Sequence, residues 1–142
     1  MRAIVHLATS ENEHPISISH IAQQEAVSPE FLEQIFFKLK KSGVIRSVRG
    51  PKGGFLLNIA PQDLSVKTIL DAVGESICLV NCTTCNPGWE CPLQPTCKAA
   101  PFWQSFYELV ECFLQSVSLQ DIIDRNCKDD YLSVVRKEGI AV

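Results

Sequence analysis

A pattern of two short helices followed by a glycine-rich hairpin constrains this chain more than any other feature. Apolar spacing predicts a helix over 18–25, and Ser28 can cap a second helix that begins at Pro29 and ends before Gly43. Where two short helices are joined by a tight turn, the second helix is the one that enters the major groove of DNA. The pattern therefore predicts a helix–turn–helix domain.

The predicted recognition helix has one apolar and one polar face. Its apolar positions recur at three- and four-residue steps and predict a buried stripe of Phe31, Leu32, Ile35, Phe36 and Leu39. Glu33 and Gln34 fall outside this stripe. A glutamate can accept a hydrogen bond from cytosine and a glutamine can pair with adenine, so both are candidates for base contacts. The helix dipole by itself also favours Glu30 and Glu33 near this end of the helix.

The hairpin that follows is basic. Two strands are predicted over 44–49 and 55–59, joined by a turn over 50–54. Six basic residues and no acidic residue lie between Lys38 and Lys52, although the net charge of the chain is −3. A hairpin of this kind beside a recognition helix is typical of a wing, and local rather than net charge determines phosphate binding. The candidates for phosphate contacts, some of which are expected only to be solvated, are Lys38, Lys40, Lys41, Arg46 and Lys52.

The second half of the chain is predicted to be helical. Ser65 and Gly74 bound a helix over 66–73, and a longer helix is predicted over 102–117, followed by a short one over 119–124. The long helix has apolar side chains at the spacing of a helix–helix seam, which are Trp103, Phe106, Val110, Phe113 and Val117. Further apolar side chains widen this seam, so we expect the helix to pack both on its own domain and on a second copy in a homodimer.

Five of the seven cysteines lie close together in a stretch without helical periodicity, at positions 78, 82, 85, 91 and 97. In a reducing compartment such a group binds metal or senses redox state more often than it forms a disulfide framework. Thiolates suit the soft iron of an iron–sulfur cluster. A structural zinc usually takes two C-x2–4-C pairs, of which Cys82 and Cys85 provide one, and bare redox-active thiols are the third interpretation. Cys112 is expected to be a core residue, and Cys127 is assigned no role.

Two motifs in the chain resemble the IscR/NsrR family of bacterial transcriptional regulators. The stretch FLEQI over 31–35, followed by SVRGPKGGFLL over 47–57, is similar to the family pattern of LEQ, a spacer and SVRGPxGGYxL. The spacing Cys85-x5-Cys91-x5-Cys97, with an aromatic helix after it, resembles the same family. The resemblance covers nearly the whole chain.

This resemblance implies a winged helix–turn–helix repressor that binds a palindromic operator in double-stranded DNA as a homodimer. It implies a [2Fe–2S] or [4Fe–4S] cluster held by Cys85, Cys91 and Cys97, through which the protein senses iron–sulfur status, nitric oxide or redox stress. It also implies that Arg49 at the tip of the wing enters a minor groove, where narrow A·T tracts attract a guanidinium group. A solvated charge at the end of a strand is the alternative for Arg49.

The fourth cluster ligand departs from the family pattern. IscR-like members carry a histidine three residues after the last cysteine, where this chain has Ala100. The candidates are Cys82, then Cys78, then a group from an N-terminal segment or from the partner chain. Because some members of the family regulate without a cluster, a thiol- or zinc-dependent regulator on the same scaffold is the alternative function.

The expected fold is mainly α-helical with a small β-hairpin wing. We expect a winged helix–turn–helix domain over 1–74, a cysteine-rich cluster-binding loop over 75–100, dimerisation helices over 101–125 and a flexible tail over 126–142. The first helix, over 1–9, lacks a capping residue and is interpreted as the end of a longer helix. No membrane span, secretory signal, catalytic triad or phosphate loop is found, so we expect a cytoplasmic protein that is not an enzyme.

Overall fold

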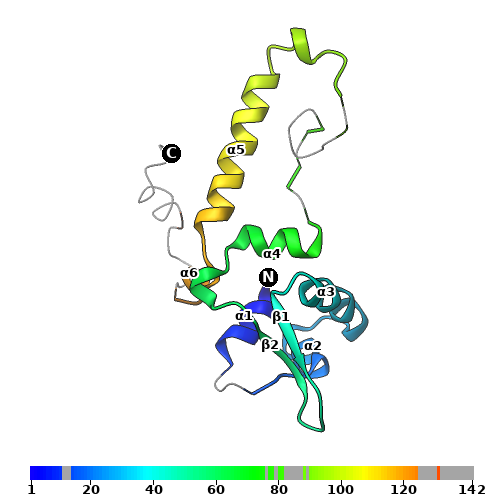
Figure 1. The fold of residues 1–142 in the computed structure, drawn as a ribbon. Coiled ribbons are helices and arrows are strands. Elements are labelled where there is room, and N and C mark those ends of the chain that lie inside the picture. Colours follow the sequence, from blue (N-terminus) through cyan, green and yellow to red (C-terminus); the bar gives the residue numbers. More distant parts are fainter. Residues whose placement is uncertain are drawn as a thin grey trace.

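Helices and one β-hairpin surround the core of the N-terminal part of the chain, and a long helix projects from it (Figure 1). The computed structural model describes residues 1–10, 14–75, 77–78, 80–81, 88, 90–124 and 131. The elements, in chain order, are α1 (Arg2–Thr9), α2 (Ile18–Glu25), α3 (Pro29–Lys41), β1 (Ile45–Val48), β2 (Gly54–Leu57), the 3₁₀ helix η1 (Pro61–Asp63), α4 (Val66–Val73), the 3₁₀ helix η2 (Gln94–Thr96), α5 (Ala100–Ser116) and α6 (Leu119–Asp124). The mainly helical architecture with a hairpin confirms the predicted fold class.

Serine caps determine where three of the helices begin. Each capping hydroxyl accepts a hydrogen bond from the backbone N–H three residues later, which satisfies a donor that the first helical turn leaves unpaired. These pairs are Ser17 with His20 (3.2 Å), Ser28 with Phe31 (3.2 Å) and Ser65 with Thr68 (3.1 Å). At its other end α4 stops at Gly74, whose φ of 74° is easily adopted only by glycine. The predicted bounds of α2, α3 and α4 are confirmed.

The core lies between α1, α2, α3, α4, β1 and the start of α6. Its fully buried large side chains are Phe36, Ile21, Leu39, Ile45, Leu64, Ile69, Leu119 and Val44. One member of the predicted stripe is not part of it, because Phe31 is 55% exposed. Phe31 lies at the edge of α3, beside a cavity of about 270 Å³ that Ile35 and Val73 also line.

The hairpin is antiparallel, with Ile45 opposite Leu57 and Val48 opposite Gly54. It is shorter than the sequence predicts at its outer ends. The N–H of Val44 bonds the carbonyl of Leu39 at 3.0 Å, so it belongs to the turn that ends α3 rather than to the strand. Only the short turn over 42–44 therefore separates the end of α3 from the start of β1.

Charged side chains join α4 to α5. Lys67 Nζ lies 2.9 Å from Asp71 Oδ2 on its own helix and 3.0 Å from Glu111 Oε2 on α5. The hydrogen bonds to Asp71 and then to Glu111 raise the pKa of Lys67 above its ordinary value. Burial and then a hydrogen bond to Glu111 raise the pKa of Tyr107. This group of side chains fixes the crossing of the two helices on the one face of α5 that meets the domain.

We expect Lys67→Met to lower the free energy of unfolding by about 0.5–1 kcal/mol near neutral pH, because a partly exposed ion-pair network is removed. Since the folded pKa of Lys67 is raised, its contribution is fully present below the unfolded lysine pKa of about 10.4 and is lost as the pH rises through the higher folded pKa. Urea unfolding of both proteins between neutral and strongly alkaline pH measures this difference. A difference in stability that stays constant above the lysine pKa would contradict the assignment.

The described part of the chain leaves every residue of α5 at least partly exposed. None of its residues is buried, and Phe102 and Phe106 are 63% and 37% exposed. After it, Val117 and Leu119 return to the core, where Leu119 N bonds the carbonyl of Leu64 at 2.8 Å. Within the described part of the chain, no helix has both the length and the apolar character needed to cross a membrane.

Candidate nucleic-acid interface

The helix α3 presents a polar face on the side away from the core. Glu33, Gln34 and Lys41 are all exposed, as the sequence predicts. The cap by Ser28 fixes the first turn of this helix, which is the part of a recognition helix that reaches base edges. Glu33 and Gln34 are therefore exposed in the N-terminal half of α3.

Lys38 has a different environment from the other basic residues of this region. Its Nζ donates a hydrogen bond of 2.8 Å to the carbonyl of Val73, the last residue of α4. The bond satisfies a carbonyl that the end of a helix leaves without an intrahelical partner, and a cation is favoured there by the helix dipole. The two residues are 35 positions apart, so no local sequence signal announces the contact. Lys38 is exposed like the other basic residues, and its hydrogen bond ties the recognition helix to α4.

The wing is held against the recognition helix through its second strand. Phe55 exchanges two backbone hydrogen bonds with Ile16, of 2.9 and 3.1 Å, and its ring packs edge-on against Phe36 with centroids 5.2 Å apart. The backbones approach so closely that a Cβ on Gly54 would lie 2.3 Å from the carbonyl oxygen of Ile16. Only glycine fits there, so the sequence of the turn fixes how the wing sits beside α3.

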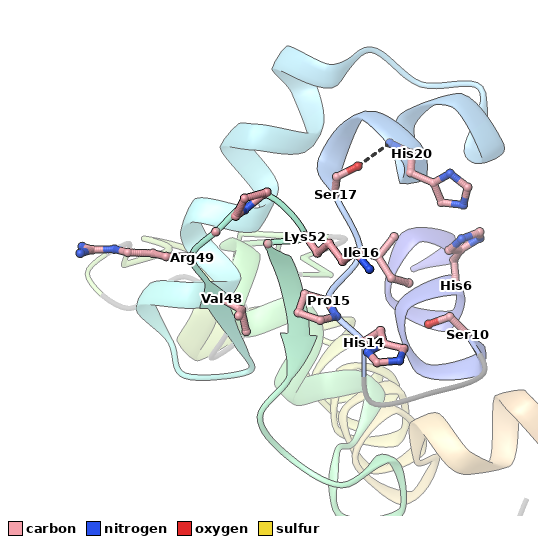
Figure 2. Close-up of a pocket in the computed structure, with 13 residues that line it drawn as sticks. His6, Ser10, His14, Pro15, Ile16, Ser17, His20, Val48, Arg49 and Lys52 are labelled. Atoms are coloured by element: carbon pink, nitrogen blue, oxygen red, sulfur yellow. Dashed lines mark hydrogen bonds between the residues drawn. The ribbon is translucent and has the colours of Figure 1, made fainter.

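The basic residues of the wing are solvent-exposed. Arg46 lies on β1, and Arg49 and Lys52 lie in the turn between the strands. The turn depends on Gly50, whose φ of 127° is disfavoured for other residues. Figure 2 shows the side chain of Arg49 directed away from the domain, at the outer end of the hairpin. Arg49 and Lys52 thus lie in the same exposed turn, and Figure 2 shows their side chains pointing to opposite sides of it.

An open pocket of about 1100 Å³ lies between the wing, α1 and the start of α2 (Figure 2). All three histidines of the chain line it, with Ser17 and Lys52. The rings of His6 and His20 meet edge to face, with centroids 5.9 Å apart. Among the described residues no His, Cys, Asp or Glu group has the arrangement of a metal site. Sequence reasoning missed this pocket because its members lie on three separate segments.

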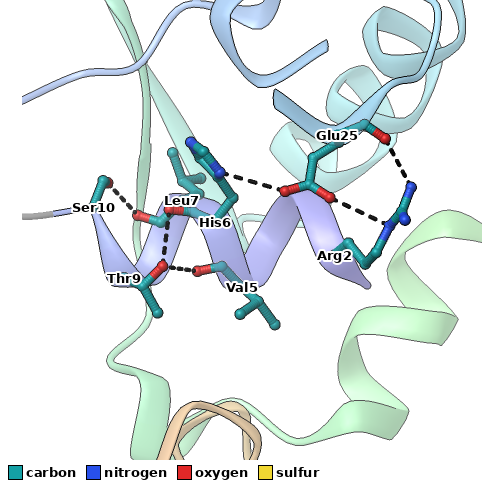
Figure 3. Close-up of polar contacts among 7 residues, drawn as sticks. All are labelled: Arg2, Val5, His6, Leu7, Thr9, Ser10 and Glu25. Carbon is teal, nitrogen blue, oxygen red and sulfur yellow. Dashed lines mark hydrogen bonds and ion pairs between the residues drawn. The ribbon is translucent and has the colours of Figure 1, made fainter. Parts of the chain in front are cut away.

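Contacts of Arg2 and His6 with Glu25 hold α1 on the end of α2 (Figure 3). Arg2 Nε lies 3.3 Å from Glu25 Oε2, and His6 Nδ1 lies 3.4 Å from Glu25 Oε1. Arg2 also donates a hydrogen bond of 2.8 Å to the backbone carbonyl of Glu25. A single carboxylate at the end of α2 therefore positions α1, which supplies His6 to the pocket.

Two of the predicted cluster ligands flank the 3₁₀ helix η2. The carbonyl of Cys91 accepts a hydrogen bond from Gln94, and the N–H of Cys97 donates to the carbonyl of Gln94. The carbonyl of Cys97 in turn accepts from Ala100, the first residue of α5. Both thiols are free and half-buried. The backbone of these two cysteines is thus continuous with the start of the long helix.

The remaining cysteines have other positions. Cys82 and Cys85 lie outside the described residues, as do Cys127 and nearly all of the tail over 126–142. Cys78 is in a disulfide bond, whereas the sequence indicates a group of thiols. The prediction that Cys112 is a core residue is wrong, since Cys112 is exposed. The physical reason lies in the packing of α5 on α4. The residue that meets α4 is Glu111, through Lys67, and the side chain of Cys112 does not lie on that contact.

Comparisons with known proteins agree with this architecture. Residues 1–125 match the family model described as Rrf2, an iron-dependent transcriptional regulator. The HTH-type transcriptional regulator IscR of Aliivibrio salmonicida is 32% identical over 124 residues, which cover 87% of this chain and 72% of the relative. The relatives are transcriptional regulators rather than enzymes.

Solved structures of such regulators have the same fold. CymR (YrzC), the global cysteine regulator of B. subtilis, superposes with a TM-score of 0.66 at 27% identity, covering 85% of this chain and 88% of that one. T. potens IscR superposes with a TM-score of 0.64 at 26% identity, covering 99% of this chain and 85% of that one. With its wing, its recognition helix and a family match over most of its length, this chain belongs to the Rrf2 family of transcriptional regulators, which includes the IscR-type proteins.

Proposed function

We propose that this protein is a homodimeric repressor that binds a palindromic operator and responds to an iron–sulfur cluster held by its cysteines. The observation that carries the cluster assignment is the pair of free, half-buried thiols of Cys91 and Cys97 on either side of η2. In the sequence they lie between the DNA-binding elements and α5, and in Figure 1 η2 lies at the start of α5, at the end of that helix away from the winged domain.

The DNA contacts that we propose divide into base readout and phosphate contacts. Glu33 and Gln34 contact base edges in the major groove, and Arg49 enters the adjacent minor groove. The exposed basic residues Lys41, Arg46 and Lys52 contact phosphates and set the salt dependence of binding. Lys38 is a further candidate for a phosphate contact, since it is exposed although its ammonium donates a hydrogen bond to the carbonyl of Val73. His14 and Lys52 both line the pocket beside the wing, and their side chains suit a phosphate at the edge of the footprint.

The uncovered face of α5 supports the homodimer. Phe102 and Phe106 are exposed on a helix that has no buried residue, and both rings contact Trp103. A contiguous aromatic surface of this kind is typical of an interface. We propose that a second copy covers it and that the two wings then meet two half-sites of the operator.

The donor set fits an iron–sulfur cluster. The proposed ligands are Cys85, Cys91 and Cys97, with Cys82 as the fourth ligand, and thiolates are the usual ligands of [2Fe–2S] and [4Fe–4S] clusters. When bound, such a cluster supplies iron that oxygen or nitric oxide can attack. The chain contributes the thiolates and holds two of them in place. The backbones of Cys91 and Cys97 are both hydrogen-bonded to Gln94 of η2, and the backbone of Cys97 is also bonded to Ala100, the first residue of α5.

The hydrogen bond of Lys38 supports a route from the cysteines to the DNA. The cysteine-rich segment begins where α4 ends, and the last residue of α4 is the acceptor of Lys38. At its other end the segment leads into α5, which Glu111 holds on Lys67 of α4. Ordering this segment would thus act on the recognition helix and on the dimer helix together.

A thiol-based regulator on the same scaffold is the second candidate. It is favoured by the disulfide of Cys78 and by the likeness to two CymR proteins. That of B. subtilis is named as a global cysteine regulator, and that of Staphylococcus aureus has been solved in an oxidised form. A structural zinc ion bound by the same thiolates is the third candidate. These alternatives share the DNA-binding half of the proposal and differ only in what the cysteines hold.

The visible absorption spectrum of protein purified without oxygen separates these functions. We expect broad bands between about 320 and 460 nm that bleach with nitric oxide or air, because thiolate-to-iron charge transfer absorbs there. Iron and zinc analysis and a gel-shift titration on genomic DNA fragments would accompany it. A colourless protein after reconstitution with iron and sulfide would overturn the cluster, whereas a lack of any DNA binding would overturn the regulator itself.

A further inference from the structure

The recognition helix has a large apolar side chain on its outer face. Phe37 is 69% exposed, although its neighbour Phe36 is completely buried. A scattered exposed apolar residue needs no special explanation in most places on a surface. Phe37 differs because it lies in the middle of the element that meets the DNA in the proposed function.

The spacing of the helix places Phe37 near the centre of its outer face. Leu32, Phe36 and Leu39 are the buried residues of α3. The opposite side of a helix with 3.6 residues per turn is followed by positions 30, 34, 37 and 41, at steps of four, three and four. All four of these residues are exposed. Phe37 therefore follows Gln34 on the line of side chains that points directly away from the core.

We propose that Phe37 is a specificity-determining residue that contacts the C5-methyl group of a thymine in the operator. This inference rests on the proposed DNA-binding function. The thymine methyl is the one apolar group that base pairs present in the major groove, and apolar side chains such as phenylalanine read it. Because three residues advance a helix by about 4.5 Å, roughly the rise of one base pair, the thymine lies within one or two base pairs of the base that Gln34 contacts.

The other exposed phenylalanine of α3 provides a contrast. Phe31 is 55% exposed, but it lies at the edge of the helix and lines the cavity shared with α1 and α4. Phe37 does not line that cavity or the pocket beside the wing. Phe31 is thus a matched control of the same residue type on the same helix, at a position that the proposed groove contact does not include.

The experiment removes single methyl groups from the DNA. Operator sequences are first selected by the full-length protein from a random duplex library, and each thymine of the consensus is then replaced by deoxyuridine. For the wild type we expect one symmetric pair of replacements to weaken binding about four-fold per half-site, the value of one buried methyl group. The Phe37→Ala protein should bind the unmodified operator as weakly as the wild type binds the deoxyuridine operator. Replacing the thymine by deoxyuridine should then change the affinity of Phe37→Ala by no more than about two-fold. Phe31→Ala should discriminate as the wild type does.

Each outcome decides a different claim. A Phe37→Ala protein that selects the same operator sequence as the wild type, and loses as much affinity on deoxyuridine replacement, would refute the thymine contact. That result would leave the DNA-binding function standing. If Phe37→Ala instead changes the oligomeric state of the DNA-free protein in sedimentation, the ring belongs to a protein interface and the inference is wrong. If the wild type enriches no sequence, the proposed function fails, and this inference fails with it.

Discussion

Arg49→Ala is expected to weaken operator binding by about 1–3 kcal/mol per protomer, or roughly 5- to 150-fold for each wing. The exposed side chain of Arg49 is directed away from the domain at the tip of a hairpin that Ile16 and Phe55 hold beside the recognition helix. A guanidinium group presented in this way can enter a narrow minor groove, and alanine cannot replace it. A gel-shift titration at fixed salt concentration measures the loss, and the dimer and the visible spectrum should not change.

Lys52→Ala is the matched control for this prediction. Lys52 lies in the same turn and is also exposed, but we assign it to a phosphate. Its removal should weaken binding to all sequences by a similar factor and reduce the dependence of affinity on salt. An Arg49→Ala protein that binds its operator as tightly as the wild type would rule out the assignment of the hairpin as a DNA-reading wing.

Cys97→Ser is expected to abolish the visible absorption bands and the bound iron, because a serine hydroxyl is a poor ligand for iron–sulfur clusters, which bind thiolate. Cys97 is free, half-buried and hydrogen-bonded through its backbone to both η2 and the first residue of α5. Its loss should therefore remove the response of operator binding to nitric oxide as well as the colour. Anaerobic absorption spectra and iron analysis of the purified variant test both effects.

Cys112→Ser provides the comparison within the same chain. Cys112 is also a free thiol, but it is exposed on α5 at a distance from the cysteine-rich segment. The Cys112→Ser protein should keep the spectrum and the iron content of the wild type. Retention of both in Cys97→Ser would show that this thiol is not a ligand, and zinc in both proteins would favour the structural metal.

The helix bounds could be predicted from the sequence because local chemistry determines them. Ser17, Ser28 and Ser65 each cap a helix with their own hydroxyl, and Gly74 ends one in a left-handed conformation. These signals operate within a few residues and do not depend on the rest of the fold. The wing was predictable for the same reason, since Gly50 and its neighbours specify the turn.

What the sequence could not predict depends on contacts between distant segments. The stripe pattern assigned Phe31 to the core, but burial at the edge of α3 depends on what α1 and α4 place there. The apolar spacing of α5 assigned Cys112 to a covered face, but α4 covers only one side of that helix. The exposure of Phe37 was open to prediction from its spacing to Leu32, Phe36 and Leu39, and the interpretation as a simple stripe missed it.

The contact between Lys38 and Val73 sets a limit on how strongly this part of the protein can be regulated. A signal cannot shift an equilibrium by more than the free energy that differs between the two states. A hydrogen bond to a charged group contributes about 1.5–3 kcal/mol, so regulation passing through this one bond amounts to about 10- to 150-fold in operator affinity per protomer. A larger change in operator affinity would require a second contribution, from a change in the relative position of the two α5 helices in the proposed dimer. Measuring the change in affinity in Lys38→Met would separate the two contributions.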